Sequence, residues 1–306
     1  MYPEYKKEDM QILLQGLNKL TKEYKSIINS KEYRRGNNLY LYLQMLRENN
    51  IMGLLRRLSN RSTTYNSLLS NAIYKKPNPD DYMTNHRIAV YTSIFGVYDH
   101  IKDPIIKPDN IDYYIITDQE SIPKSSWIFI DYRTIIPDHV KSAVERNRYV
   151  KMLPHRVFRD YDYSVYVDGN VFITSDLSIL TRTLDEYPIA MHRHKNRDCV
   201  YEEVAACIAK KKDNIEKLKL HEQLLKKNGV PVHGGLLEAT VIARKHTDAR
   251  CIEVMEKWWD EFQEYSRRDQ ISLIDCIWTL GLSVDTIAKL GDNIMDNDNF
   301  VIIPHL

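Results

Sequence analysis

The chain has 306 residues, of which 43% are hydrophobic and 10% aromatic, so it can bury a sizeable core in one large domain or two smaller ones. A net charge of +1 excludes a strongly basic nucleic-acid-binding protein. Four widely spaced cysteines exclude a disulfide scaffold. Because no apolar run approaches the length that crosses a bilayer, we expect a cytoplasmic enzyme. We also expect the cysteines to be reduced core residues, and we expect no nucleic-acid partner.

Residues 1–80 differ from the rest of the chain in charge and pattern. Lys and Arg outnumber Asp and Glu by two to one there, whereas acids are in excess over 81–306. Apolar residues recur at three- and four-residue steps over 9–28, and a second helix-compatible stretch follows at 39–58. We therefore predict a basic helical module in residues 1–80. Its cations suit a solvated helix face or peripheral membrane contact through residues 1–75. The module could also mediate self-association or cover the following domain, and the charge does not decide among these alternatives.

The segment KKPNPDD at 75–81 ends the helical pattern with two prolines, and we place a domain boundary there. Short runs rich in β-branched and aromatic residues follow at 87–96, 112–118, 126–132 and 163–169. Helices are predicted at 138–158 and near 201–228, 247–265 and 269–281. Strands that alternate with helices are typical of a parallel sheet with covering helices, so residues 81–306 are predicted to form an α/β domain.

The segment YSVYVDGNVFITSDL at 163–177 carries the most informative chemistry. Its first strand ends in Asp168-Gly169-Asn170, which sets carboxylate and amide oxygens at a strand's carboxyl end, where ligands bind in open α/β sheets. Two such side chains can face a hard divalent cation that takes diphosphate oxygens as its other ligands. Asp-Gly-Asn is also ideal for a tight turn between two strands, and the tripeptide alone favours the turn.

Several segments, taken in their order along the chain, favour a ligand site over a simple turn at 168–170. They are IAVYTSIFGVYD, RNRYVKMLPHRVFRDYDYSVYVDGNVFI, HRHKNRDCVYEE, GGLLEATVIARKH and WWDEFQEYSRRDQIS. Over residues 87 to about 280 the chain resembles a glycosyltransferase-like family, first catalogued as a domain of unknown function, with plant mucilage, cell-wall and bacterial members. More remotely, it is similar to family 8 glycosyltransferases. The resemblance implies a GT-A fold, which is Rossmann-like and binds nucleotide sugars, after the N-terminal helical module.

The resemblance also implies a metal site. Asp168 and Asn170 stand where GT-A enzymes have the two acids of Asp-x-Asp, so Asp168 would contact the ribose or the metal and Asn170 would ligate Mn²⁺ or Mg²⁺ directly. Because the second acid is missing, the attraction for the cation is weaker. His305 matches the late histidine ligand of family 8 enzymes, although the motif around it is absent.

Other residues are expected to bind the nucleotide. Thr92 ends the first strand, where GT-A enzymes seat the nucleobase and ribose. Arg148 and Lys151 are three residues apart, a spacing that places them on one helix face, so they could clamp the diphosphate. A solvated helix face is the competing interpretation.

The sugar pocket is expected from three further motifs. His194 follows a predicted strand and could bind sugar hydroxyls or transfer a proton. Gly234 and Gly235, three residues before Glu238, permit close backbone approach to a ligand, although ordinary turn usage also explains them. The remaining candidates are Asp269 and Gln270, which match the Asp-Gln pair of family 8 enzymes, although Asp269 could simply cap a helix.

We predict a glycosyltransferase that transfers a sugar from a nucleotide diphosphate sugar, with a UDP-sugar favoured, to a glycan or glycolipid acceptor in polysaccharide or glycoconjugate synthesis. Glu238, Asp269 or Glu202 could be the base of an inverting enzyme, whereas a retaining one can act without a base, and the sequence does not decide between the two. The amide at position 170 leaves open a non-catalytic nucleotide- or carbohydrate-binding protein of the same fold. A hydrolase is disfavoured because Gly-x-Ser-x-Gly is absent.

Overall fold

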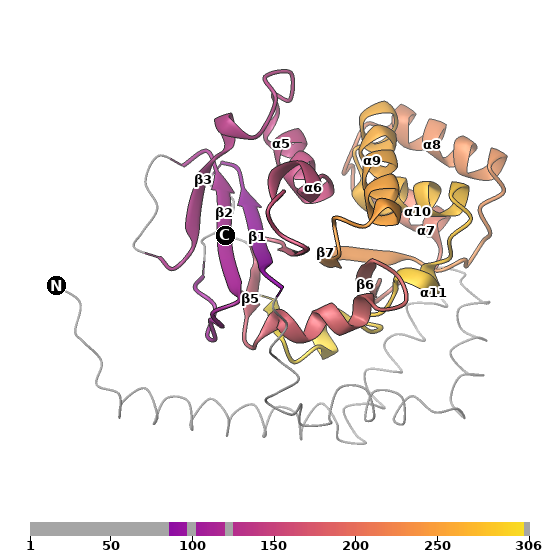
Figure 1. Ribbon diagram of the computed structural model, residues 1–306. Coiled ribbons are helices and arrows are strands. Elements are labelled where there is room, and N and C mark those ends of the chain that lie inside the picture. The colour runs from indigo at the N-terminus through magenta and orange to yellow at the C-terminus, as the bar shows by residue number, and fades with distance from the viewer. Residues whose placement is uncertain (1–85, 97–101, 120–124, 303–306) are drawn as a thin grey trace, which may run out of the picture. The chain divides into compact units, whose positions relative to one another are not determined.

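The computed structural model describes residues 86–96, 102–119 and 125–302 (Figure 1). The helical module predicted for residues 1–80 lies outside these residues. A mixed six-stranded sheet has the order β3 (Ile128–Asp131), β2 (Ile111–Thr117), β1 (Ile88–Ile94), β4 (Tyr163–Val167), β7 (Leu237–Arg244), β6 (Ile189–Arg193), and a small sheet pairs β5 (Val171–Ile173) with β8 (Phe300–Ile302).

The parallel half of the large sheet agrees with the predicted strands. β1 pairs in parallel with β2 and β4, and β2 pairs in parallel with β3. The helix expected between β3 and β4 is divided into α5 (Ala143–Met152) and α6 (Pro154–Val157). Pro154 explains the division, because proline has no N–H to donate within a helix but suits the first helical position. A Ser142–Glu145 capping box fixes the start of α5.

The other half of the sheet departs from the prediction of a parallel sheet. β7 runs antiparallel to both β4 and β6. Between β6 and β7 the chain forms two helices, α7 (Val200–Ala209) and α8 (Ile215–Lys227), which pack against each other. A pair of helices returns the chain to the edge from which it left, whereas a single crossover helix would carry it to the opposite edge and give a parallel strand. The helical hairpin therefore makes the sheet mixed.

Both faces of the sheet are covered. Tyr91, Tyr166 and Ile242 pack on one face with residues of α5, α7, α9 (Ala249–Glu264) and α10 (Asp269–Thr279). Val90 and Val165 pack on the other face, against η4 (Leu177–Leu184), η5 (Ile294–Asp296) and the small sheet. This double burial explains why every residue of β1 is buried. Figure 1 shows α7, α8, α9 and α10 gathered at the β7 end of the sheet.

Two short elements complete the described structure, η3 (Tyr132–Thr134) after β3 and α11 (Val284–Ile287) after α10. None of the described helices is long and apolar enough to span a membrane. All four cysteines are buried and free, which confirms that they are core residues.

The strand directions bring several chain ends to one edge of the sheet. β1, β2, β3, β4 and β6 run the same way, so their carboxyl ends share that edge with the amino end of β7. Polar residues from distant motifs are therefore placed near one another, at the position where ligands bind in open α/β sheets.

Candidate active site

Asp168 is the first residue after β4, and its carboxylate is accessible at the sheet edge. Its backbone N–H donates to the carbonyl of Thr240 on β7 at 2.9 Å, which fixes the end of the strand. The hydroxyl of Tyr166 donates to Asp168 Oδ1 at 2.8 Å, and Lys151 Nζ lies 3.4 Å from the same oxygen. The Asp168 side chain is 32% exposed. An oriented, solvent-accessible carboxylate can bind a ligand or a cation.

The segment from Asp168 to Val171 is a turn, but it is not a hairpin. The N–H of Val171 donates to the carbonyl of Asp168 at 2.9 Å, the bond of a four-residue turn. β5, which follows, pairs with β8 instead of β4. The turn therefore connects two sheets, and half-buried Asn170 lies on it next to the sheet edge.

Arg148 and Lys151 on α5 face Asp269 at the start of α10. Lys151 Nζ lies 2.9 Å from Asp269 Oδ2, and Arg148 Nε lies 3.2 Å from the same oxygen. Burial opposes ionisation of Asp269, but Arg148, then Lys151 and Arg268, hold the pKa of this carboxyl well below its usual range. The structure therefore contradicts a solvated helix face for Arg148 and Lys151. Asp269 does not cap α10 with its side chain.

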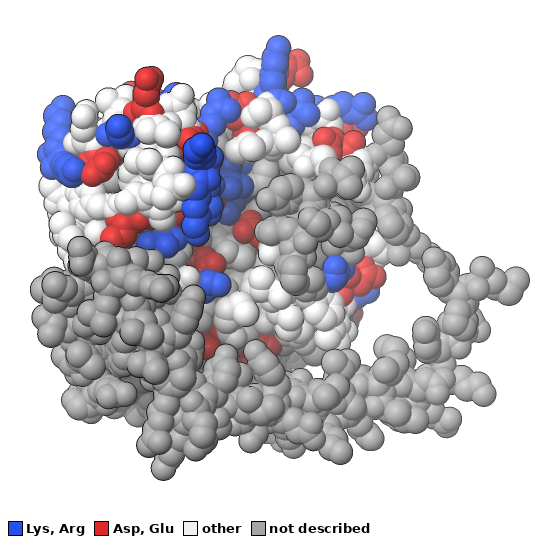
Figure 2. All heavy atoms as spheres, turned by 180° about the vertical axis from the view of Figure 1, so that it is seen from behind, with Lys and Arg blue, Asp and Glu red and all other residues white. Residues whose placement is uncertain are grey.

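The charge of Lys151 is thus shared between two carboxylates, Asp168 and Asp269. Arg148 contacts the same Asp269 oxygen, so both cations of this helix face are partly neutralised by protein carboxylates. Figure 2 shows Lys and Arg side chains gathered along the middle of one face, with Asp and Glu side chains beside them.

Glu238 lies on the same edge, near the start of β7. It pairs with His192 of β6 across a bulge, and the hydroxyl of Thr240 donates to its Oε1 at 3.2 Å. Burial raises the pKa of Glu238, and the charge of Asp168 raises it further, whereas Lys195 lowers it. Asp168 and Glu238 are therefore within electrostatic reach of each other, and Glu238 is suited to proton transfer.

His194 extends β6 at this edge, where its N–H donates to the carbonyl of Leu236 at 2.8 Å. Its Nδ1 accepts the N–H of Arg197 at 3.0 Å, which places the ring proton on Nε2. Burial lowers the pKa of His194 to about 4. The neutral imidazole can therefore donate a hydrogen bond through Nε2, as expected of a residue that binds hydroxyl groups.

Protein packing accounts for the paired glycines. Gly235 has a φ of +96°, and a Cβ there would lie 2.9 Å from Val284 Cβ. A Cβ on Gly234 would lie 2.8 Å from Cγ of Pro231. Close packing against other parts of the chain is thus sufficient to explain the glycines. Backbone contact with a ligand at this turn stays a prediction.

Three other predicted residues are less well placed. Thr92 is 2% exposed and alternates with Tyr91, so it faces the side of the sheet opposite α5, and its hydroxyl has no hydrogen-bond partner among the described residues. This burial contradicts a nucleotide-binding role for its side chain. Gln270 is half-buried on α10, 3.5 Å from Nη2 of Arg268. His305 lies outside the described residues.

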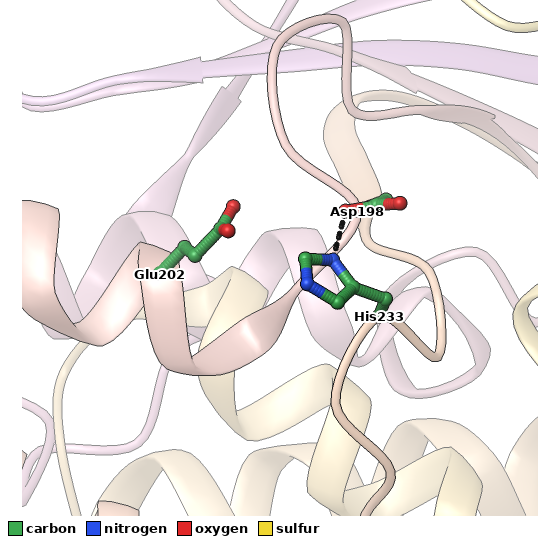
Figure 3. Close-up of side chains that lie close together, drawn as sticks. All are labelled: Asp198, Glu202 and His233. Atoms are coloured by element: carbon green, nitrogen blue, oxygen red, sulfur yellow. Dashed lines mark hydrogen bonds and ion pairs between the residues drawn. The ribbon is translucent and has the colours of Figure 1, made fainter. Parts of the chain in front are cut away.

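A second polar cluster was not predicted as a unit. Asp198 from the loop after β6, Glu202 on α7 and His233 from the loop before β7 lie together, with possible ligand atoms all within 4.8 Å of one another (Figure 3). His233 Nδ1 is 2.7 Å from Asp198 Oδ1. Glu202 also lines a hollow of about 590 Å³ between α7 and α8. Glu202 was a candidate base in the sequence, but the pattern contained no signal for Asp198.

Comparison with known proteins identifies the family of this chain. Residues 73–301 match the TOD1/MUCI70 family, described as a glycosyltransferase-like domain. The chain belongs to this family. A protein of Arabidopsis thaliana named probable hexosyltransferase MUCI70 is 26% identical to this chain over 211 residues. That match covers 60% of this chain and 36% of the plant protein, so the chain spans about a third of that relative's length.

Solved glycosyltransferase structures are also similar to this member of the TOD1/MUCI70 family. The apo structure of bifunctional WbbM has a TM-score of 0.40 and 14% identity, and covers 66% of this chain and 39% of that one. The apo structure of mouse xyloside xylosyltransferase 1 has a TM-score of 0.40 and 9% identity, and the match covers 66% of this chain and 83% of the mouse protein. The resemblance to a glycosyltransferase-like family, inferred from the sequence motifs, is confirmed by the family match.

Proposed function

We propose that the protein is a GT-A glycosyltransferase that transfers a hexosyl or related unit from a nucleotide diphosphate sugar, preferably a UDP-sugar, to a hydroxyl of a glycan or glycolipid. Membership of the TOD1/MUCI70 family supports this reaction class. The observation that carries the proposal is the position of Asp168, whose accessible carboxylate lies at the carboxyl end of β4 beside Lys151. Carboxylates at this edge are suited to hold a diphosphate through a cation.

We propose Mn²⁺ or Mg²⁺ as the cation. The residues present fit a weak site, because one carboxylate at Asp168 and one amide oxygen at Asn170 leave most positions of a hard cation to water and phosphate oxygens. When bound, the cation would stabilise negative charge on the departing diphosphate. Tyr166 orients the carboxylate of Asp168, and Arg148 contributes a positive charge from α5.

Glu238 and His194 would then act on the sugar side of the site. Glu238 is a candidate base for the acceptor hydroxyl in an inverting reaction, because burial holds its pKa above the ordinary value. His194 would donate to a sugar hydroxyl through Nε2. A retaining reaction would require positioning by the same residues without a general base.

The proposal is tested by incubating the full chain with UDP- and GDP-sugars, Mn²⁺ and a panel of glycan acceptors, and by measuring nucleotide release. We expect release with at least one donor, and its loss in Asp168→Ala. Asp260→Ala is the matched control, since Asp260 is exposed on α9. Release that persists in Asp168→Ala would overturn the assigned site, and nucleotide-sugar binding without release would identify a non-catalytic binding protein.

A further inference from the structure

Three ionisable side chains from three different helices meet in the interior, apart from the proposed active site. They are His221 on α8, Glu261 on α9 and Asp275 on α10, with exposed fractions of 0%, 9% and 0%. One nitrogen or oxygen of each lies within 4.8 Å of the corresponding atoms of the other two. Two carboxylates are seldom buried so close together unless something compensates their charge.

The three side chains share a second property. His221 Nε2, Glu261 Oε2 and Asp275 Oδ2 are each buried without a hydrogen-bond partner among the described residues. Buried polar atoms nearly always have a partner, because a buried polar atom without one destabilises the folded state. Unsatisfied atoms on three side chains that meet so closely therefore point to a ligand among them.

The outer atom of each side chain is held by a different neighbour. His221 Nδ1 lies 2.8 Å from Ser266 Oγ, Asn228 Nδ2 donates to Asp275 Oδ1 at 2.9 Å, and Lys257 Nζ lies 3.2 Å from Glu261 Oε1. Metal ligands in proteins are commonly oriented in this way, by hydrogen bonds to the atom that does not bind the metal.

From this arrangement we propose that His221, Glu261 and Asp275 bind a divalent cation, Zn²⁺ in the first place, that ties α8, α9 and α10 together. Zinc takes imidazole nitrogen and carboxylate oxygen at about 2.0–2.2 Å in a tetrahedron, which separates its ligand atoms by roughly 3.4 Å. His221 Nε2 and Asp275 Oδ2 are 3.6 Å apart. The imidazole favours zinc over Mg²⁺ or Ca²⁺, which prefer oxygen ligands alone.

The zinc complex requires one tautomer of His221. Nδ1–H donates to Ser266 Oγ, and the lone pair of Nε2 faces the carboxylates. This tautomer gives up the longer contact of 3.4 Å in which the Ser266 N–H faces Nδ1. The opposite tautomer, with a proton on Nε2, is the arrangement expected if the centre holds water or if the carboxylates share a proton.

The cation would hold the middle of α10 against α8 and α9. Asp275 lies on the same helix as Asp269, which pairs with Lys151 on α5. The site is separate from Asp168 and does not depend on the proposed reaction, so metal binding is measured without any assay of sugar transfer.

The test uses the full chain, purified without chelator and without a histidine tag. We expect about one equivalent of zinc per chain by elemental analysis, a melting temperature that rises when zinc is added back to chelator-treated protein, and the visible absorption of tetrahedral Co²⁺ on substitution with cobalt. Glu261→Gln and Asp275→Asn each remove a charged ligand at nearly constant volume and should weaken zinc binding by about 100-fold or more.

Two variants serve as controls. Glu264→Gln changes an exposed carboxylate on the same helix as Glu261, and Glu202→Gln changes the second polar cluster, so both should retain zinc at this site. The proposal is overturned if the wild-type chain neither contains zinc nor responds to added zinc and cobalt, or if both ligand variants bind zinc as the wild type does. If the stability of the wild type does not respond to zinc and Glu261→Gln is more stable than the wild type, the result would instead mean that Glu261 and Asp275 share a proton.

Discussion

Lys151 and Asp269 are 118 positions apart in the sequence and form a buried ion pair, with Nζ 2.9 Å from Oδ2. Their side chains are 2% and 6% exposed. Arg148 contacts the same carboxylate oxygen, and Lys151 also reaches Asp168. The pair therefore joins α5 to α10 next to the carboxylate on which the proposed activity depends.

The first prediction concerns this pair. Asp269→Asn should lower the free energy of unfolding by about 3–5 kcal/mol, because it leaves the buried cation of Lys151 without its main partner. The native pKa of Asp269 is below its usual range, so its contribution is fully present above the ordinary aspartate pKa and is lost as the pH falls towards the native value. Urea unfolding at pH 7 measures the loss.

A double variant, Lys151→Met with Asp269→Leu, is the control, because it removes both charges. It should recover part of the stability lost in Asp269→Asn. A loss below about 1 kcal/mol in Asp269→Asn would mean that Arg148 and Lys151 are satisfied without this carboxylate.

The second prediction concerns the amide at position 170. Asn170→Asp adds a second carboxylate beside Asp168 and should strengthen Mn²⁺ binding by roughly tenfold, since affinity for hard cations rises with the number of charged ligands. Calorimetry with Mn²⁺ in the presence of UDP measures the change. Asn214→Asp adds the same charge at the exposed N-cap of α8, where Asp caps equally well, and should leave the affinity unchanged. An unchanged affinity in Asn170→Asp would remove position 170 from the metal site.

The extent to which this fold could be predicted depends on the element. Runs such as IAVYTSI and YSVYV are short, β-branched and ended by turn residues, so their strands were placed within two residues. The direction of β7 was not predictable from such a run, because it depends on the two helices that return the chain to the same edge. Strand propensity is local, whereas strand direction is set by the connection.

The same distinction applies to the site. Asp168, Arg148, Lys151 and Asp269 were chosen from separate motifs, and the structure brings them together. Their pairing could not be predicted, because nothing local indicates that Lys151 would pair with Asp269 instead of a diphosphate. Thr92 was misplaced for a related reason, since the end of a strand indicates the edge but not the face towards which a side chain points.

The third prediction is that stability falls as the pH is lowered from about 6.5 to about 4. Burial lowers the pKa of His192, His194 and His246 to about 4, so in this interval the unfolded chain takes up protons that the native chain does not. Each histidine should reduce the free energy of unfolding by about 1–2 kcal/mol at pH 5 relative to pH 7. Denaturant unfolding at the two pH values measures the sum, and His246→Gln should remove about one third of it. Equal stability at both values would contradict the burial of these imidazoles.

The fourth prediction rests on the proposed reaction. A carboxylate base must be ionised to act, so kcat/KM should fall at acidic pH as Glu238 is protonated. The midpoint of this fall should lie above pH 4.5, because burial raises the pKa of Glu238. Lys195 lowers that pKa, and Lys195→Met should therefore move the limb to higher pH. Glu238→Gln should reduce kcat by about 10²–10⁴-fold. Full activity in Glu238→Gln would assign the reaction to a mechanism that needs no carboxylate base at this position.

The fifth prediction concerns the loop that leads into Glu238. Gly235 and Gly281 both have positive φ, +96° and +72°, but only Gly235 has neighbours where a Cβ would stand, since Val284 Cβ lies 2.9 Å away and nothing lies within 4 Å at Gly281. Gly281→Ala should lose about 1–2 kcal/mol for backbone strain alone. Gly235→Ala should lose about 1–3 kcal/mol more, because Val284 must also shift.

Val284→Ala separates the two contributions at Gly235. In the combined variant the smaller side chain relieves the contact, so the loss should be less than the sum of the two single losses, and denaturant unfolding gives this coupling directly. Equal losses in Gly235→Ala and Gly281→Ala would assign the requirement for glycine at 235 to the backbone alone.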